Sequence, residues 1–424
     1  MNTVQAGRSN DQARMRIAII IVLTISVLVF ANGSNAPIDL ASLYIAASFY
    51  DDGLYHLIYP LDGDFFWNDI PIEWQERAAL SSDGISIVTP YVYPPIWVAI
   101  LAPVTKFVSF DIFARVVLVI NVGSFIGMIW LGFRMLKPRR VLATVWVAVS
   151  ALLLLITSVS HLSLSLGQPQ IFVTFLIMLA FCNLIENKPA GAGGWLALAA
   201  AIKVAPALLA IIFLMERNWR ALLWFGVLGG MLGGLSILMT GWPLHAEFLD
   251  KLRELEGTIL VSGINLGMDL PLLLLWQAYN GTLSLETLRI DLWPEPKWIL
   301  WSVRATFLSG LIVCFFVSRN LEAHKRVWAR LLTTSLVLLF TSPLGWLHYL
   351  ILPMMLLPGI LEFSSRRLGI LTIAAVAVGY SLPLYFVLSE QSTTFVLQVF
   401  LHFILAVLLF TSILIVCVRQ SQRS

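Results

Sequence analysis

Long apolar runs separated by short polar segments recur along almost the whole chain. A helix that crosses a membrane needs about 20 mostly apolar residues, although tilted or buried helices can be shorter. This pattern predicts an all-α polytopic membrane protein with about 12 transmembrane helices, folded as a single integral membrane domain over residues 1–424. The expected helices cover residues 15–32, 113–136, 141–160, 168–186, 189–203, 205–216, 221–240, 298–318, 328–342, 346–361, 368–388 and 394–418.

The first apolar run, residues 17–30, follows Arg14 and Arg16 and resembles a signal peptide. It lacks a small-x-small cleavage pattern before Pro37, so we expect a first helix that is retained in the mature protein. Because Lys and Arg favour the cytoplasmic side of a first helix, the N-terminus is expected inside.

Residues 93–110 are mostly apolar and long enough to be considered as a membrane-crossing helix, but a crossing here would conflict with the positions of the basic residues that follow. The next helix would then carry the basic cluster 137–140 to the outer side, which the positive-inside rule disfavours. We therefore expect an amphipathic helix on the outer surface here. With that choice Lys and Arg concentrate in the inner segments, Asp and Glu concentrate in the outer ones, and both termini are cytoplasmic.

Two outer segments, residues 33–112 and 241–297, are too long to serve only as connectors. The first contains many acidic and aromatic residues, and the second includes residues 245–256, whose apolar side chains recur at helical spacing. Most inner connections are only a few residues long, so chemistry is expected at the outer face. We find no inverted repeat in the sequence, a feature that would favour a transporter.

Composition excludes several classes of protein. Hydrophobic residues make up 59% and charged residues 12% of the chain, whereas soluble proteins have roughly 45–50% and 25%. The net charge of +3, without a basic patch, gives no support for a nucleic-acid partner. Cys182, Cys314 and Cys417 lie in apolar runs without paired spacing, and no metal or nucleotide motif occurs, so we expect neither metal nor cofactor.

Asp39 is the first candidate for chemistry. It follows the first helix directly and begins an amphipathic segment that includes Tyr44. A carboxylate at this position either stabilises the helix start or acts as a general base that removes a proton from a sugar or lipid hydroxyl. The residues alone leave both interpretations open.

Tyr93 and Gln168 lie at the starts of two further expected helices. Pro94 and Pro95 fix the entry of the helix that follows Tyr93, and the alternative is that they position Tyr93 and Tyr91 beside a substrate. Gln168 lies between Gly167 and Pro169. Its amide either hydrogen-bonds sugar hydroxyls or caps its helix.

Lys203 interrupts the otherwise uncharged stretch 195–206. A cation between apolar helices is costly and marks a functional site by default, unless its long side chain extends to the outer headgroups. We expect Lys203 to bind a phosphate. Arg115 and Arg304, each just inside an outer helix end, either join Lys203 or anchor their helices at the interface.

His348 and Trp346 lie together at the start of another expected helix, after Ser342 and Pro343. A histidine in such a place is commonly structural or interfacial, and the alternative is a substrate-binding role. Trp346 either stacks on a sugar or lipid or belongs to the interfacial aromatic belt.

In their order along the chain these motifs resemble the GT-C superfamily of integral membrane glycosyltransferases. The resemblance is greatest to glycosyltransferase family 87, the polyprenyl-phosphomannose-dependent alpha-1,2-mannosyltransferases. The acidic segment 62–84 matches no motif of the family. The matching pieces are Asp39-x4-Tyr44-x-Ala46-Ala47 with Gly53-Leu54-Tyr55, Tyr93-Pro94-Pro95, Gly167-Gln168, Ala190-Gly191 with Lys203-x2-Pro206, and Ser342-Pro343-x2-Trp346-x-His348.

The resemblance implies a GT-C fold with juxtamembrane helices in the first outer loop, and a catalytic aspartate early in that loop, which is Asp39 here. It also implies a site on the periplasmic face of a bacterial inner membrane, without a metal. Together with the interpretations above, it gives the expected substrate-binding residues Lys203, His348, Tyr93, Gln168, Arg115, Arg304, Tyr44 and Trp346.

The expected reaction moves a sugar, mannose by resemblance, from a polyprenyl phosphate sugar to a hydroxyl of a glycolipid or glycan, with inversion at the anomeric carbon. Asp39 would be the base and Lys203 would stabilise the departing phosphate. Membrane lipids are the other expected partners. The alternatives are a lipid or small-molecule transporter or flippase, and a polyprenyl-carrier-dependent ligase or phosphotransferase, which differs in whether the phosphate stays with the carrier.

Overall fold

The computed structural model describes residues 2–34, 36–59, 70–82, 85, 88–283, 291–389 and 392–422. Across these residues the fold consists of helices and one two-stranded antiparallel sheet, so the expected all-α class is confirmed.

The first half contains α1 (Asn2–Asn32), α2 (Ile38–Asp51), η1 (Tyr55–Leu57), α3 (Ile72–Ser81), α4 (Ile96–Phe107), α5 (Phe110–Leu136), α6 (Ala143–Ile156), α7 (Ser158–Ser165), α8 (Gln170–Ile185), α9 (Pro189–Ile202), η2 (Ala205–Ala210) and α10 (Ile211–Met215). The second half contains α11 (Trp219–Leu255), β1 (Thr258–Val261), α12 (Asp269–Tyr279), β2 (Asp291–Pro294), α13 (Lys297–Ser318), α14 (Ala323–Thr341), η4 (Leu347–Leu350), α15 (Ile351–Leu356), η5 (Leu357–Gly359), α16 (Ile360–Phe363), α17 (Arg366–Gly379), α18 (Leu382–Ser389) and α19 (Ser392–Ser421).

Five helices in the described part of the chain are long and apolar enough to cross a membrane. They are α1 from Asp11 onward, α5, α11, α13, and α19 from Thr394 onward. The pair α7 and α8, which bends by 117° at its junction, makes a sixth span if it is counted as one. The polytopic membrane character is therefore confirmed, whereas the expected number of about 12 crossing helices is not.

Two segments that the sequence predicts as continuous helices, 141–160 and 368–388, are each interrupted. The interruptions meet in space, because Thr157 and Ser381 form an isolated antiparallel bridge. The N–H of Ser158 also donates across this contact to a backbone carbonyl oxygen at 2.7 Å. A break in a buried helix leaves backbone groups that need partners, and here each break supplies partners to the other.

The helix α11 joins two helices that the sequence predicts separately, 221–240 and 245–256. Gly241 lies at the join with φ 78° and ψ 159°, a backbone conformation that glycine adopts without strain. Pro243 follows within the same bend. Beyond it the helix continues to Leu255 and packs against α4, with Leu244 and Phe248 buried in the core that α2 also lines.

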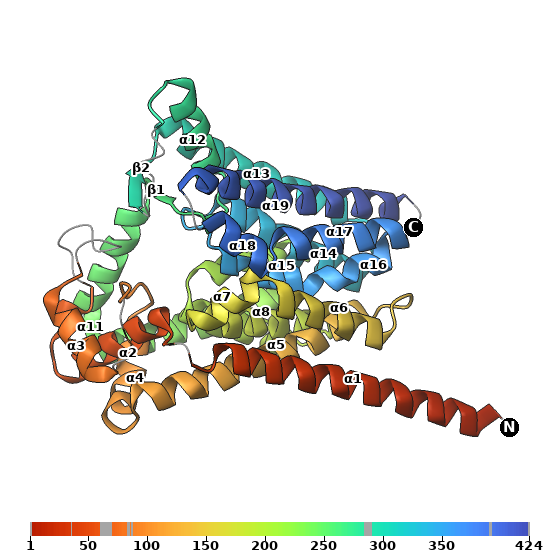
Figure 1. Cartoon of the computed structure of the whole chain (residues 1–424), viewed down its shortest axis with the longest axis horizontal. Coiled ribbons are helices and arrows are strands. Elements are labelled where there is room, and N and C mark those ends of the chain that lie inside the picture. The colour runs from red at the N-terminus through yellow and green to blue at the C-terminus, as the bar shows by residue number, and fades with distance from the viewer. Residues whose placement is uncertain are drawn as a thin grey trace.

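The helices α2, α3 and α4 form a layer at one end of the helix bundle (Figure 1). The α4 helix packs along α2, and the hydroxyl of Tyr44 on α2 donates to the backbone carbonyl oxygen of Val108 at 2.8 Å. Trp74 of α3 is fully buried and meets the ring of Phe49 on α2 edge-on, with 5.5 Å between ring centroids. This layer has its own apolar core, distinct from that of the bundle.

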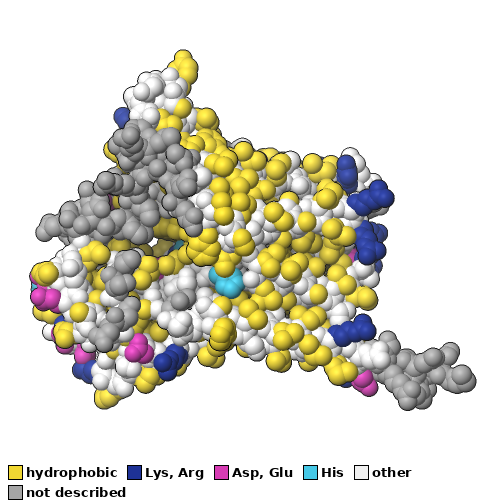
Figure 2. Space-filling model, in the orientation of Figure 1, with side chains coloured by type: hydrophobic (Ala, Val, Ile, Leu, Met, Phe, Trp, Pro, Cys, Tyr) yellow, Lys and Arg dark blue, Asp and Glu magenta, His cyan; other side chains and the backbone are white. Residues whose placement is uncertain are grey.

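Charged side chains gather toward the two ends of the molecule, with a hydrophobic band between them (Figure 2). Lys and Arg dominate the end near the C-terminus. Arg326 and Arg330 of α14 both pair with Glu216 at 2.8 Å. Asp and Glu gather at the end formed by α2–α4. Of the acidic segment 62–84, the α3 helix is described, whereas residues 62–69, 83 and 84 lie outside the described residues.

The largest core lies among α5, α6, α8, α9, α14 and the helices from α15 to α19. A second core lies beneath α2, α3 and the segment that enters α4. The sheet pairs β1 with β2, from Thr258 opposite Pro294 to Val261 opposite Asp291, and packs with α12, α13 and α19 in a third, smaller core. The candidate site lies where the first two cores meet, so rigid elements position its side chains.

Candidate functional site

Asp39 lies in the first turn of α2 and is held by side chains from two other segments. Its Oδ1 accepts a hydrogen bond from the Thr89 hydroxyl at 3.1 Å, and its Oδ2 accepts one from the side-chain amide of Gln168. The residue that precedes α2 is Pro37, and no side chain caps the helix. The carboxylate therefore stands near the positive end of the helix but does not cap it, which favours a chemical role over the capping interpretation.

The turn between α7 and α8 fixes the backbone next to Asp39. The carbonyl oxygen of Leu166 accepts hydrogen bonds from the backbone N–H groups of Asp39 at 3.1 Å and Leu40 at 3.3 Å. Gly167 follows with φ +67°, and a Cβ there would lie 2.7 Å from the Pro37 Cβ. Only glycine lets the turn approach α2 this closely.

Gln168 is 6% exposed and does not cap α8, whose preceding residue is Pro169 and whose start has no side-chain cap. Its amide nitrogen donates to Asp39, while its Oε1 is buried without a hydrogen-bond partner among the described residues. The capping interpretation of Gln168 is therefore wrong, and its side chain orients the Asp39 carboxylate.

Burial raises the pKa of the Asp39 carboxyl above its usual value of 3.8. The hydrogen bonds from Thr89 and Gln168 and the positive charge of Lys203 oppose this effect, in that order, without cancelling it. A carboxylate whose pKa is raised accepts a proton more readily than an exposed one.

Lys203 lies just beyond α9, with extended backbone (φ −146°, ψ 125°) that carries its side chain away from the helix. Its Nζ is 3.3 Å from Nε2 of His348 and 4.5 Å from the ring centroid of Tyr349. When Lys203 is charged, its ammonium group can only donate, and Nε2 of His348 is then the acceptor. Within the described chain no carboxylate lies within ion-pair distance of Lys203, so its charge remains available to an anion.

His348 lies in η4 and is 2% exposed. Its ring stacks on Trp346, with 6.0 Å between centroids, and meets Tyr349 edge-on at 4.9 Å. These aromatic contacts and the bond to Lys203 fix the imidazole in one orientation. The fold therefore places three sequence-predicted residues, His348, Lys203 and Trp346, next to one another.

Asn265, which the sequence analysis did not identify, holds this segment in place. Its Oδ1 accepts from the backbone N–H of Gly345 at 3.2 Å and of Gly267 at 2.9 Å, and its Nδ2 donates to the Leu260 carbonyl oxygen at 2.8 Å. The side chain is 1% exposed. The clustered glycines around it were a signal for a turn, but nothing local indicated that the turn would pack against the His348 segment.

Tyr93 is buried in an aromatic group that precedes α4. Its ring meets that of Tyr91 edge-on, with 5.7 Å between ring centroids. The backbone carbonyl oxygen of Tyr93 accepts a hydrogen bond from the Tyr59 hydroxyl, and the Tyr91 hydroxyl donates to the Pro94 carbonyl oxygen at 2.9 Å. The prolines thus set the entry of α4, as the sequence predicts, while Tyr93 also lines the site.

Most of these side chains, but not Asn265 or Tyr91, line one cavity of about 250 Å³. Its remaining lining is mainly apolar and includes Leu162, Phe248, Leu252 and Ile264. Residues far apart in the sequence therefore share a small, mostly apolar space, whose described lining includes one carboxylate, Asp39, and one lysine, Lys203. The sequence-predicted residues that line this cavity are Asp39, Tyr93, Gln168, Lys203, Trp346 and His348.

Three other sequence-predicted residues lie elsewhere. Arg304 of α13 pairs with Glu256 at 3.1 Å, and both line an adjoining, larger cavity of about 650 Å³. Arg115 of α5 lines a separate cavity on the other side of the start of α2. Tyr44 lines none of these cavities, and its ring packs edge-on against Phe110 at 5.5 Å.

The chain was compared with known families and proteins. Residues 91–347 match the family model of glycosyltransferase family 87. The matched range contains Tyr93, Gln168, Lys203 and Trp346, whereas Asp39 precedes it. None of the curated proteins matches the chain.

Proposed function

The chain belongs to glycosyltransferase family 87, and we propose that it transfers a sugar from a polyprenyl phosphate sugar to a hydroxyl of a glycolipid or glycan. Mannose is the sugar that the family resemblance suggests. The observation that carries the proposal is the convergence of Asp39 and Lys203 on one cavity, beside a larger apolar one. A base, a cation for phosphate and a space for a lipid are the three parts that this reaction requires.

In the proposed reaction, Asp39 takes the proton of the acceptor hydroxyl as the oxygen attacks the anomeric carbon. The new bond joins that oxygen to the anomeric carbon, and the bond from this carbon to the phosphate oxygen breaks. The electron pair leaves with the polyprenyl phosphate, so the phosphate stays on its carrier. One displacement from the face opposite the phosphate inverts the configuration, and a beta-linked donor gives an alpha-linked product.

The surroundings of Asp39 suit a general base. Its raised pKa strengthens proton acceptance at neutral pH, and the side chains of Thr89 and Gln168 fix the direction of the carboxylate. Fixed geometry matters because a base must lie within hydrogen-bond reach of the proton that it removes.

Lys203 stabilises the charge that develops on the departing phosphate. Its Nζ binds His348 through one of its three donors, which leaves two for phosphate oxygens. A phosphate leaving group needs no protonating acid, so a positioned cation is sufficient. His348 acts here as a neutral acceptor that directs the ammonium group.

The adjoining cavity of about 650 Å³ gives the polyprenyl chain a place next to the phosphate. It shares Leu252, Leu255 and Tyr349 with the site cavity and is lined mainly by apolar side chains of η2, α13 and α14. Burial of isoprenoid surface against such side chains stabilises a lipid by roughly 0.8 kcal/mol per CH₂ group.

The proposed site faces the periplasm across a bacterial inner membrane, with both termini in the cytoplasm. The gathering of Lys and Arg at the opposite end of the molecule supports this orientation (Figure 2). A flipped lipid donor supplies sugar on that face, where soluble nucleotide sugars are absent.

The test is transfer of radiolabelled mannose from polyprenyl phosphomannose to extracted membrane glycolipids by the purified full-length protein. We expect labelled glycolipid with the wild type and none with Asp39→Ala of matched folded amount. Asp51→Asn is the control, because Asp51 lies at the other end of α2 and pairs with Lys106 at 2.9 Å. Lack of transfer by the wild type across a panel of acceptors would overturn the proposal, and movement of labelled lipid between leaflets without a new bond would favour a flippase.

A further inference from the structure

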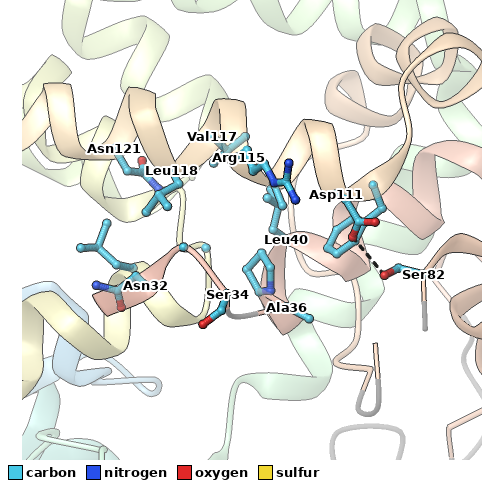
Figure 3. A pocket seen from close by; sticks show the side chains of 16 residues that line it. Asn32, Ser34, Ala36, Leu40, Ser82, Asp111, Arg115, Val117, Leu118 and Asn121 are labelled. Carbon is cyan, nitrogen blue, oxygen red and sulfur yellow. Dashed lines mark hydrogen bonds between the residues drawn. The ribbon is translucent and has the colours of Figure 1, made fainter. Parts of the chain in front are cut away.

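A second cavity with a more polar lining, separate from the site above, lies where the end of α1 and the start of α2 meet α5. It encloses about 170 Å³. Pro37, Leu40 and Gly167 line it, whereas Ile38, Asp39 and Gln168 line the site cavity. The first turn of α2 is thus a shared wall. Figure 3 shows Arg115, Asp111 and Asn121 projecting from α5 toward this space, with Asn32 and Ser34 across from them.

Two opposite charges line the cavity without pairing. Asp111 and Arg115 are one helical turn apart on α5, a spacing at which such residues commonly form an ion pair. Here Asp111 accepts a hydrogen bond from the Ser82 hydroxyl at 3.1 Å, and Arg115 has neither an ion pair nor a hydrogen bond with any described residue. Both charges are therefore available to a third group.

A buried amide lies deeper in the same cavity. Asn121 is 2% exposed, and no described residue hydrogen-bonds its side chain. Asn32, across the cavity, uses its Nδ2 on the Leu28 carbonyl oxygen and leaves its Oδ1 free. Both amides line the cavity, and their free atoms are accessible from it rather than sealed in the protein. They can therefore hydrogen-bond a polar occupant of the cavity.

The cavity lies at the end of two membrane-crossing helices. α1 ends at Asn32 and α5 begins at Phe110, so the charged residues stand at the level where these helices leave the apolar phase. Val116 and Val119 on α5 are 51% and 64% exposed, and Phe30 on α1 is 91% exposed. Exposed apolar side chains along spanning helices face lipid chains.

We propose that this cavity binds the headgroup of a zwitterionic phospholipid with a primary ammonium group, of the phosphatidylethanolamine class. The lipid phosphate pairs with Arg115 and the ammonium group with Asp111. Asn121 and Asn32 supply the donors and acceptors for the remaining oxygens, and the acyl chains follow the exposed apolar faces of α1 and α5. A purely anionic headgroup fits less well, because Asp111 repels it.

This binding also bears on the first turn of α2. The headgroup fills the space behind Pro37 and Leu40, on the side opposite Asp39. An occupied cavity therefore supports the wall that carries the carboxylate. Binding of a phospholipid at this cavity is independent of which sugar and which donor the protein uses.

The test reconstitutes the full-length protein in nanodiscs of phosphatidylcholine with equal parts phosphatidylethanolamine and phosphatidylglycerol. The lipids retained after extraction into detergent are then measured by quantitative mass spectrometry. We expect the wild type to enrich phosphatidylethanolamine over phosphatidylglycerol about tenfold, the ratio that corresponds to one charge-assisted hydrogen bond. Asp111→Asn keeps the bond to Ser82 and should lose this preference, whereas Arg115→Gln should lose retention of both lipids.

The matched controls are Asp250→Asn and Arg253→Gln, a neighbouring acid and arginine on α11 that pair with each other at 2.6 Å. They should leave the lipid ratio unchanged. The proposal is overturned if the wild type enriches neither lipid, if Asp111→Asn keeps the wild-type ratio, or if the control variants shift the ratio as much as the cavity variants do. Circular dichroism of each variant verifies that the helices are intact.

Discussion

Substitution of Asp39 by Asn removes the proposed base and keeps the shape of the side chain. The Thr89 hydroxyl still has an oxygen to which it donates, as it does now at 3.1 Å. The amide of Gln168 can rotate by half a turn, so that its unpartnered Oε1 accepts from the new amide nitrogen. With both hydrogen bonds retained, we expect the free energy of unfolding to change by no more than about 1.5 kcal/mol.

The effect on catalysis should be much larger. A positioned general base contributes typically 10²–10⁴-fold, so kcat should fall by about that factor while KM changes little. The assay is the initial rate of sugar transfer at saturating polyprenyl phosphomannose, with thermal unfolding measured on the same preparations. Asp51→Asn, on the same helix, should keep near-wild-type activity because Asp51 lies at the far end of α2 and, among the described residues, pairs only with Lys106, whose side chain is 55% exposed. A folded Asp39→Asn variant with kcat within tenfold of the wild type would refute the role of Asp39 as base.

Three further predictions follow from the same geometry. Since only the carboxylate accepts a proton, kcat/KM should fall as the pH drops through the raised pKa of Asp39. Thr89→Val removes a hydrogen bond that lowers this pKa, so it should move the acidic limb of the pH–rate profile to higher pH. An acidic limb that does not move would contradict a role of the Thr89 hydrogen bond in setting this pKa. Lys203→Gln should lower kcat by about 10²–10³-fold in the same transfer assay, because a donor aimed at the developing phosphate charge is lost. A change in KM alone would contradict stabilisation of the departing phosphate by Lys203. Gly167→Ala should lower the thermal unfolding temperature more than Gly53→Ala does. Both glycines have positive φ, which costs an alanine about 1–3 kcal/mol, but only at Gly167 would the new Cβ contact residues at the start of α2. Equal decreases in the two variants would show that this close approach does not affect stability.

Much of the helical framework could be predicted from the sequence, because apolar runs of helical length determine where helices form in a membrane protein. The interruptions were harder to predict. Pro383 cannot donate a backbone hydrogen bond, so it marks one break within 368–388. At Thr157 nothing local marks the break, which depends on a bridge to Ser381 from a distant segment.

The site was partly predictable for a similar reason. Asp39 and Lys203 are conspicuous because charged groups are rare in apolar surroundings, and His348 stands near a predicted helix start. Thr89 and Asn265 are ordinary loop residues in sequence, and their roles arise only from the tertiary contacts of their side chains.

Arg115 and Arg304 each line a cavity other than the one that contains Lys203. Both lie near the ends of spanning helices, as the sequence predicts, but a position along the membrane normal does not specify which cavity a side chain faces. Helix packing around α2 and α13 decides that, and it separates both arginines from the cavity that contains Lys203.

The most direct test of the proposed mechanism follows the fate of a beta-linked donor that is labelled in both sugar and phosphate. After transfer by the wild-type protein, NMR of the product gives the anomeric configuration, and the phosphate label is measured in the lipid carrier and the product. Single displacement with Asp39 as base predicts an alpha-linked sugar in the product and all of the phosphate label on the carrier. A beta-linked product, or phosphate label transferred with the sugar, would contradict this mechanism.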